Sequence, residues 1–330
     1  MPPAVDLGRR CARALSVTRW FSATTTSDYP SPSPSPSPSP PLPPPIRVAL
    51  TESAGRGVFA TRRIGAGDLL HTAEPLVAHP SLSLRHSVCY FCLRNLKSET
   101  NSGFCSDECI DQSKGFYEAE KKIDWSAFDD YCRTQGLKYP LLVKRLACMV
   151  MSGEASAEIL DILQPARLQS ETIIRHVLLS SLTQMEEESR LMRSTFSKAG
   201  FKDEQMNFLT KQWYTGVLAR IRINAFRVEL IGGLYEDLFL SAAASVDAGA
   251  AVGNAVYMLP SFYNHDCDPN VHILWIDNTT ARLKALREIE AGEELRICYI
   301  DASMDHDARN ALLFNGFGFV CNCLRCSSGD

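Results

Sequence analysis

Residues 261–270 read SFYNHDCDPN, and this stretch is the most informative part of the 330-residue chain. The turn-forming sequence GEEL follows at 292–295, Tyr299 comes four residues after that turn, and the cysteine motif CNCLRC stands at 321–326. No single piece of this series decides a fold or a function. The informative property is the order of the pieces and the spacing between them.

Order and spacing together resemble the SET domain of protein-lysine methyltransferases. The resemblance covers roughly residues 46–330 and is most specific at 254–326. It implies an α+β fold of short twisted β-sheets, in which the Asn-His segment threads beneath a loop as a pseudoknot. A zinc-bearing helical insert and a zinc-binding tail after the SET domain complete the expectation. The layout is similar to SET and MYND proteins, and its short tail looks more like the plant trithorax-related SET group.

The resemblance assigns roles to single residues. Tyr299 matches the catalytic tyrosine, whose hydroxyl would orient the amine and the methyl group. Asn264 and His265 match the pair that contacts S-adenosylmethionine. The other candidate cofactor contacts are Asn224, Phe319, which would lie on the adenine, and Gly55, Arg56 and Gly57 of a Gly-x-Gly motif.

Each of these residues has a more ordinary interpretation when taken alone. His265 could be a core histidine bonded to the main chain, Tyr299 a packing residue in an apolar strand, and Phe319 part of the core. Gly-x-Gly by itself is a weak signal. Three motifs in the family's order, with the cysteine triplet at the expected distance after Tyr299, favour the SET fold.

Lysine methylation in such a site makes few chemical demands. The reacting amine must be neutral, although a lysine in water has a pKa of about 10.4. A narrow apolar channel lowers that pKa by desolvation, and aromatic walls tolerate the ammonium until it loses its proton. Tyrosine is a poor base at neutral pH because its ordinary pKa is about 10, so water is the better proton acceptor. Alignment and electrostatics then supply most of the catalysis.

The segment 86–112 contains four cysteines with the spacing of a structural zinc site. Two residues separate the first pair, twelve follow, and three separate the second pair, so each pair can direct two sulfurs at one ion. The expected ligands are Cys89, Cys92, Cys105 and Cys109. The pattern looks like half of a MYND finger, and the remaining ligands of a complete finger are not evident. We therefore expect one structural zinc here.

A second zinc site is expected at the C-terminus, where Cys321, Cys323 and Cys326 supply three thiolates. A closed structural site needs a fourth ligand. In SET proteins with MYND fingers the cysteine equivalent to Cys267 joins the triplet and pins the tail against the active-site segment. The alternative is that Cys267 is a small core residue and that zinc takes a water or another side chain.

Composition argues against several classes of function. The net charge of -4 gives no electrostatic basis for nonspecific DNA binding, and we expect no direct nucleic-acid partner. The sequence has no secretory h-region and no apolar run of about 18 residues, so no membrane association is expected. Eight of the twelve cysteines fall in the two sets described above, which favours zinc ligation in a reducing compartment over a disulfide framework.

The chain divides by composition. Residues 1–29 are arginine-rich and poor in acids, as in an organelle transit peptide; a disordered basic tail is the alternative. Residues 30–45 form a Pro/Ser linker of stiff polyproline II character. The SET domain is expected at 46–300, interrupted by the 86–112 zinc module and a helical insert at 113–222, with the zinc tail at 301–330. Apolar spacing predicts helices at 139–151, 155–163, 169–195 and 203–220.

These expectations lead to one hypothesis and one rival. The hypothesis is a monomeric, S-adenosylmethionine-dependent protein-lysine methyltransferase with two zinc ions, whose substrate is a lysine-containing protein, histone or non-histone. The rival is a catalytically inactive SET-fold scaffold that holds protein partners. A genuine transit peptide would place the protein in a mitochondrion or plastid, whereas a histone substrate would place it in the nucleus.

Overall fold

The computed structural model describes residues 43–97, 103–166, 175–231 and 251–330. Contacts divide the chain into two units, Met1–Pro43 and Pro44–Asp330, and the described residues belong almost entirely to the second. The expected leader and all but the end of the expected linker lie outside the described residues. Within the described part, no helix combines the length and apolar character needed to cross a membrane.

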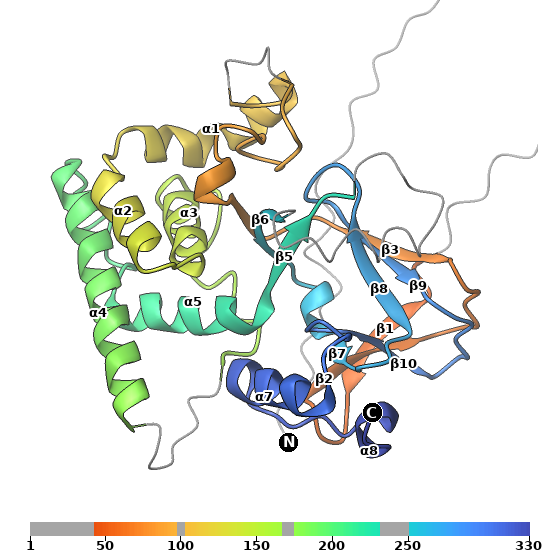
Figure 1. Cartoon of the computed structure of the whole chain (residues 1–330). Helices are drawn as coiled ribbons and strands as arrows, with labels where there is room; N and C mark the ends of the chain where they lie inside the picture. The colour runs from red at the N-terminus through yellow and green to blue at the C-terminus, as the bar shows by residue number, and fades with distance from the viewer. Residues whose placement is uncertain (1–42, 98–102, 167–174, 232–250) are drawn as a thin grey trace, which may run out of the picture. The chain divides into compact units, whose positions relative to one another are not determined.

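Short strands form three small sheets (Figure 1). The first sheet has the order β1 (Ile46–Leu50), β2 (Arg56–Ala60), β10 (Glu294–Ile297), β7 (Asn264–His265). The second has the order β3 (Leu69–Ala73), β9 (Ala281–Ala285), β8 (Val271–Trp275). The third has the order β4 (Val77–Pro80), β6 (Ala251–Val256), β5 (Ala225–Glu229). The small sheets of short strands that the resemblance implied are confirmed.

One pairing decides where the site forms. The strand pairs within the three sheets are antiparallel, except that β7 runs parallel to β10. Asn264 pairs with Arg296 and His265 with Ile297. Because β10 ends just before Tyr299, the pairing brings the Asn-His segment beside the tyrosine, although about thirty residues separate them.

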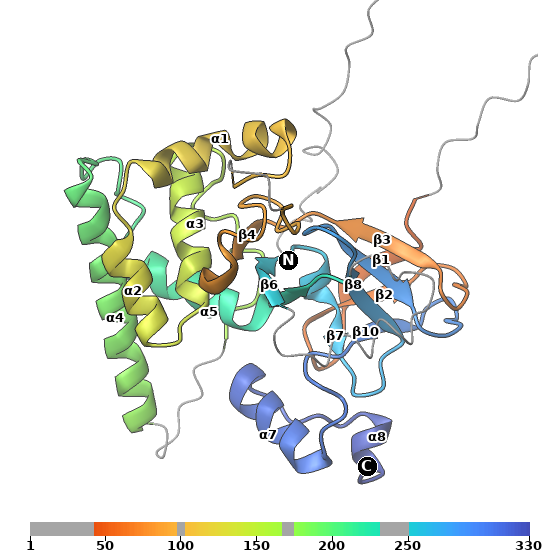
Figure 2. The same cartoon turned by 45° about the horizontal axis from the view of Figure 1, so that its top comes forward.

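The helices between β4 and β5 gather on one side of the strands (Figures 1 and 2). They are α1 (Asp107–Lys121), α2 (Ser126–Thr134), α3 (Tyr139–Met151), α4 (Arg175–Lys198) and α5 (Lys211–Asn224). Two further helices follow β10, α7 (His306–Phe317) and α8 (Leu324–Ser327). Single turns of 3-10 helix lie at η1 (Leu82–Leu84) and η2 (Pro260–Phe262).

The helix expected at 139–151 is confirmed, the one expected at 155–163 is wrong, and the one expected at 203–220 is wrong at its start. Residues 155–163 form successive turns, closed by bonds such as Leu163 N–H to Leu160 O at 2.9 Å, so the apolar spacing there reflects three-residue turns. The helix expected at 203–220 begins only at Lys211, because the Thr210 hydroxyl caps it by accepting from Trp213 N–H at 3.1 Å. The start expected at 169 for α4 falls outside the described residues.

A buried charged group joins the helices to the first cysteine segment. Arg145, on α3, is 2% exposed, and its Nε lies 2.7 Å from Glu120 Oε1 on α1. The other oxygen of Glu120 accepts from the Tyr90 hydroxyl at 2.6 Å. Arg145 Nη1 also donates to the carbonyl oxygen of Ala78 on β4 at 3.1 Å. One guanidinium thus ties two helices, a strand and the loop of Cys89 and Cys92.

Replacing Glu120 by alanine is expected to destabilise the protein by about 3–5 kcal/mol, because it leaves the Arg145 charge buried without its partner. The matched control is Glu118→Ala on the same helix, where the side chain is exposed and the cost is expected to stay within about 0.5 kcal/mol. Urea unfolding followed by circular dichroism at saturating zinc measures both. Equal midpoints for the two variants would contradict this role of Glu120.

Candidate functional site

The side-chain amide of Asn264 holds the Gly-x-Gly strand against β10. Its Nδ2 donates to Glu294 Oε1 at 2.7 Å and to the carbonyl oxygen of Arg56 at 3.2 Å. A β-carbon added to Gly57 would lie 2.7 Å from both Glu294 Oε1 and Thr51 Cγ2, and 3.1 Å from Asn264 Nδ2. A larger residue at position 57 would therefore displace these side chains, a packing constraint that the sequence alone could not distinguish from a turn glycine.

The imidazole of His265 joins the tyrosine segment to the cysteine tail. Its Nδ1 accepts the main-chain N–H of Tyr299 at 3.1 Å, and its Nε2 lies 3.3 Å from Cys267 Sγ. Burial lowers the pKa of His265 to about 4, with Arg309 and Arg296 contributing in the same direction. The ring is therefore neutral at physiological pH. Because Nδ1 is an acceptor, the proton sits on Nε2 and points at the sulfur.

The hydroxyl of Tyr299 is fixed by a short bond to the main chain. It donates to the carbonyl oxygen of Tyr263 at 2.6 Å. The Tyr299 ring centre lies 4.9 Å from that of Phe317, 5.3 Å from His265 and 6.5 Å from Phe319. Burial raises the pKa of Tyr299 far above its ordinary value, and Glu294 adds to the effect. Tyr299 is consequently a neutral phenol in an aromatic surrounding.

Sequence reasoning missed His71, which holds Tyr263 in place. Tyr263 is fully buried, and its hydroxyl lies 2.9 Å from Nε2 of His71 on β3. Nδ1 of His71 faces the Thr72 carbonyl at 3.2 Å and must carry the proton there, so Nε2 accepts from Tyr263. The His71 side chain thereby fixes the residue whose carbonyl receives the Tyr299 hydroxyl. Tyr263 lay within the quoted motif, but no sequence signal pointed to His71.

The segment 162–166 lies against the Gly-x-Gly turn. Gly55 has a φ of +78°, and a β-carbon there would collide with Gln164 Nε2. Arg56 donates to the carbonyl oxygen of Ile162, and its guanidinium lies 4.4 Å from the ring centre of Phe262. This covering segment includes the end of the stretch wrongly expected to be helical.

Asn224 is placed differently from the other candidate contacts. It is the last residue of α5 and is 7% exposed. Its Nδ2 donates to the carbonyl oxygens of Gln164 at 2.9 Å and Arg220 at 2.7 Å. Its amide nitrogen thus fixes the covering segment, whereas Asn264, His265, Tyr299 and Phe319 lie together.

Four cysteine sulfurs converge beside His265. They belong to Cys267, Cys321, Cys323 and Cys326, all buried, and the sulfurs lie within 4.8 Å of one another. The sulfur of Cys267 lies 3.9 Å from that of Cys321 and 3.6 Å from that of Cys326. Four sulfurs at about 2.3 Å from a tetrahedral zinc are about 3.8 Å apart. The cluster therefore fits zinc, and Cys267 lies where the fourth ligand was expected.

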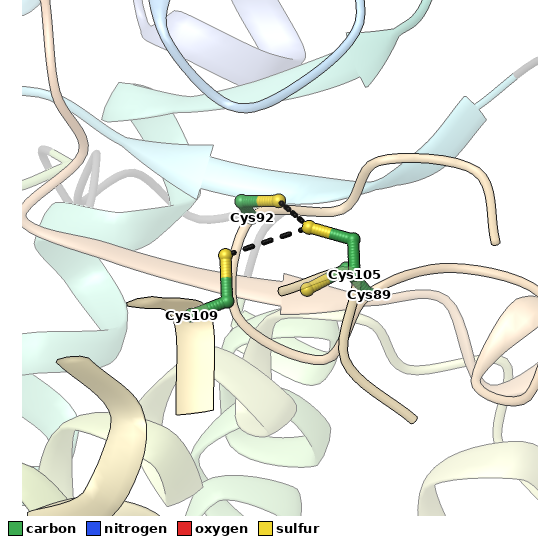
Figure 3. Close-up of side chains that lie close together, drawn as sticks. All are labelled: Cys89, Cys92, Cys105 and Cys109. Atoms are coloured by element: carbon green, nitrogen blue, oxygen red, sulfur yellow. Dashed lines mark hydrogen bonds between the residues drawn. The ribbon is translucent and has the colours of Figure 1, made fainter. Parts of the chain in front are cut away.

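The other cysteine set converges as well (Figure 3). Cys105 Sγ lies 3.5 Å from the sulfurs of both Cys92 and Cys109, and Cys89 completes a group within 4.8 Å. The Ser106 hydroxyl caps α1 and places Cys109 on its first turn. None of the cysteines in the described part forms a disulfide. The two four-thiolate groups are compatible with two zinc ions.

Residues 55–300 match the model of the SET domain family, and the chain belongs to that family. It is 60% identical over 292 residues to histone-lysine N-methyltransferase ATXR4 of Arabidopsis thaliana, covering 87% of each protein. A SET and MYND domain-containing protein of Dictyostelium discoideum is 26% identical, over 78% of this chain and 77% of that protein.

A solved structure described as "Crystal structure of the SET domain of LSMT bound to MeLysine and AdoHcy" aligns with a TM-score of 0.44 at 11% identity. The alignment covers 84% of this chain and 52% of that one, so the chain spans about half the length of that structure.

The protein as purified is expected to contain two zinc ions per chain. Replacing Cys321 by serine should remove one ion, because three thiolates bind zinc less tightly than four. The control is Cys298→Ser, since Cys298 donates to the carbonyl oxygen of Ile300 and belongs to neither cluster. Metal analysis by mass spectrometry measures the content. A Cys321→Ser protein that keeps both ions would refute the assignment of the second cluster.

Proposed function

We propose that the chain is an S-adenosylmethionine-dependent protein-lysine N-methyltransferase. The observation that carries the proposal is the hydroxyl of Tyr299, held against the carbonyl oxygen of Tyr263 beside His265. Membership of the SET family and the 60% identity to a protein named as a histone-lysine N-methyltransferase support it. The same geometry argues against an inactive scaffold, which has no need of a fixed tyrosine hydroxyl.

The residues that would hold the cofactor fit such a molecule. Asn264 offers a side-chain amide, Gly57 brings main chain close without a β-carbon in the way, and Phe319 offers an aromatic face 5.9 Å from the His265 ring centre. S-adenosylmethionine supplies an electrophilic methyl group when bound. In this proposal Asn224 does not contact the cofactor itself but fixes the segment that covers Gly55.

Tyr299 would act as an orienting group. Its phenol stays neutral across the physiological range because burial raises its pKa, so it does not remove the proton from the substrate amine. The ring of Phe317, whose centre lies 4.9 Å from that of Tyr299, would give the amine an apolar surrounding that favours its neutral form. The rate is expected to rise with pH as the substrate lysine loses its proton, without a fall from ionisation of Tyr299.

The zinc ions would serve structure. Each cluster offers four protein thiolates, and a closed set of four leaves no position for a reacting water. The second cluster would hold the tail that carries Phe319 against the active-site strand. The first would order the loop between β4 and α1. Half of a MYND finger gives no reason to add peptide binding to this role.

The substrate in this proposal is a lysine-containing protein. Histone is the substrate class in the name of the Arabidopsis relative, and it would place the enzyme in the nucleus. A non-histone substrate is the alternative, and it is required if residues 1–29 direct the protein to a mitochondrion or plastid. The domain limits given above, the monomeric state and the absence of a nucleic-acid partner remain parts of the same proposal.

Tyr299→Phe is expected to reduce methyl transfer by about 100-fold or more, because it removes the hydroxyl that this proposal places at the reacting atoms. Transfer of isotopic methyl from labelled S-adenosylmethionine to core histones and to a protein extract measures it. The control is Tyr139→Phe on α3, which removes a tyrosine hydroxyl outside the site.

Equal labelling by wild type and Tyr299→Phe would refute the role of the hydroxyl. Absence of labelling by folded, zinc-loaded wild-type protein would favour the scaffold. Labelling of extract proteins but not of histones would retain the enzyme and exclude the histone substrate.

A further inference from the structure

Arg309 is a buried cation that the proposed reaction does not use. It lies on α7 and is 0% exposed. Its Nη1 donates to the carbonyl oxygen of Met304 at 2.6 Å, and its Nη2 donates to the main-chain oxygen of Asp330. Within the described ranges no ion pair between a carboxylate side chain and Arg309 is found. Arg325 and, more weakly, Arg309 lower the pKa of the Asp330 carboxyl, so Arg309 already has one anion nearby. A buried guanidinium is stabilised further by each additional anion within its reach.

The same guanidinium also lies beside the second cysteine cluster, which would be anionic with zinc bound. Arg309 Nη2 is 3.8 Å from Cys326 Sγ, a member of the second cysteine cluster. Four thiolates around one divalent zinc carry a net charge of two negative units, which is costly to bury. Two main-chain N–H groups reach the sulfurs, Cys323 N to Cys321 Sγ and Cys326 N to Cys323 Sγ, each at 3.5 Å. They are neutral donors and leave the charge uncompensated.

We propose that Arg309 is the positioning residue that retains zinc in the second cluster, by neutralising the tetrathiolate charge and donating a hydrogen bond to Cys326. One guanidinium also ties the cluster to the start of α7, through Met304, and to Asp330 beyond α8. Figures 1 and 2 show α7 and α8 lying next to each other with the C-terminus at α8. A lysine could keep the charge but not reach three partners in one plane.

Retention of this zinc also affects the candidate methyl-transfer site. Cys267 belongs to the same cluster and lies 3.3 Å from His265 Nε2. Loss of the zinc would free Cys267 and the tail together, and with them the aromatic side chain of Phe319. The inference concerns zinc retention and holds whether or not the protein transfers methyl groups.

The test compares the full chain, loaded with two zinc ions, as wild type, Arg309→Met and Arg309→Lys. Release of zinc to a chromophoric chelator is followed over time. In Arg309→Met one equivalent is expected to leave about 10- to 100-fold faster than in wild type, the usual cost of removing a partner of a metal ligand. The equivalent in the first cluster should leave at the wild-type rate, so it serves as an internal control. The release rate of Arg309→Lys is expected to lie between those of wild type and Arg309→Met.

Arg325→Met is the matched control. Arg325 lies in the same tail and also contacts Asp330, with Nε 3.1 Å from Oδ2, but its described bonds reach no sulfur. The two zinc ions of the Arg325→Met protein should leave at wild-type rates. Arg309→Met with two wild-type release rates would overturn the proposal. If Arg309→Met does not fold, Arg309→Gln, which removes the charge but keeps a polar side chain, takes its place, and wild-type release rates there overturn the proposal equally.

A second readout separates a charge effect from simple loosening of α7. In protein loaded with cobalt instead of zinc, loss of a cationic donor raises the energy of the thiolate electrons. The sulfur-to-cobalt charge-transfer band of one cluster should therefore move to longer wavelength in Arg309→Met and remain in place in Arg325→Met. An unchanged band in a folded Arg309→Met protein that still binds two cobalt ions would contradict the proposal.

Discussion

The neutral imidazole of His265 is the contact on which the site depends. It accepts the Tyr299 main-chain N–H on one side and points its own N–H at Cys267 on the other. A protonated ring could not accept from Tyr299, and burial prevents protonation by lowering the pKa of His265 to about 4. One fixed tautomer therefore links the strand that carries the tyrosine to the cluster that fits zinc.

The rest of the fold places Tyr299 and Cys267, the two partners of the His265 imidazole. The parallel pairing of β7 with β10 brings His265 beside Ile297, two residues before Tyr299. The Tyr299 hydroxyl then donates to the carbonyl oxygen of Tyr263, whose own hydroxyl is held by Nε2 of His71. On the other side, Cys267 meets three cysteines of the tail, whose charge Arg309 compensates in our proposal. The covering segment 162–166 is tied to α5 through Asn224, which donates to the carbonyl oxygen of Gln164.

Much of this arrangement could be predicted from the sequence, because metal ligands and turn glycines carry distinct local signals. The spacing of the cysteines predicted the first four-thiolate group and the three tail cysteines of the second, and resemblance supplied Cys267 as its fourth ligand. The order of the Asn-His, GEEL and tyrosine motifs predicted the SET fold. The packing reason for Gly57 came only from the structure, since it depends on Glu294 and Asn264 approaching from distant segments.

Other features left no local signal. His71 and Arg309 work through buried contacts with partners far along the chain or beyond a loop, and ordinary sequence neighbours surround them. Periodicity misplaced a helix at 155–163 because leucines at three-residue spacing, such as Leu160 and Leu163, also suit a run of turns. It extended another helix past its true start because Thr210 was not recognised as its cap.

The most direct test of the link through His265 is calorimetric titration of S-adenosylmethionine into two proteins. One is the wild type with two zinc ions bound, and the other is Cys267→Ser prepared in the same way. The account predicts binding to wild type and an affinity at least about ten-fold lower in the variant, because loss of a zinc ligand releases the tail and removes the partner of His265. Equal affinity in the two proteins, with the variant folded and lacking one zinc, would contradict it.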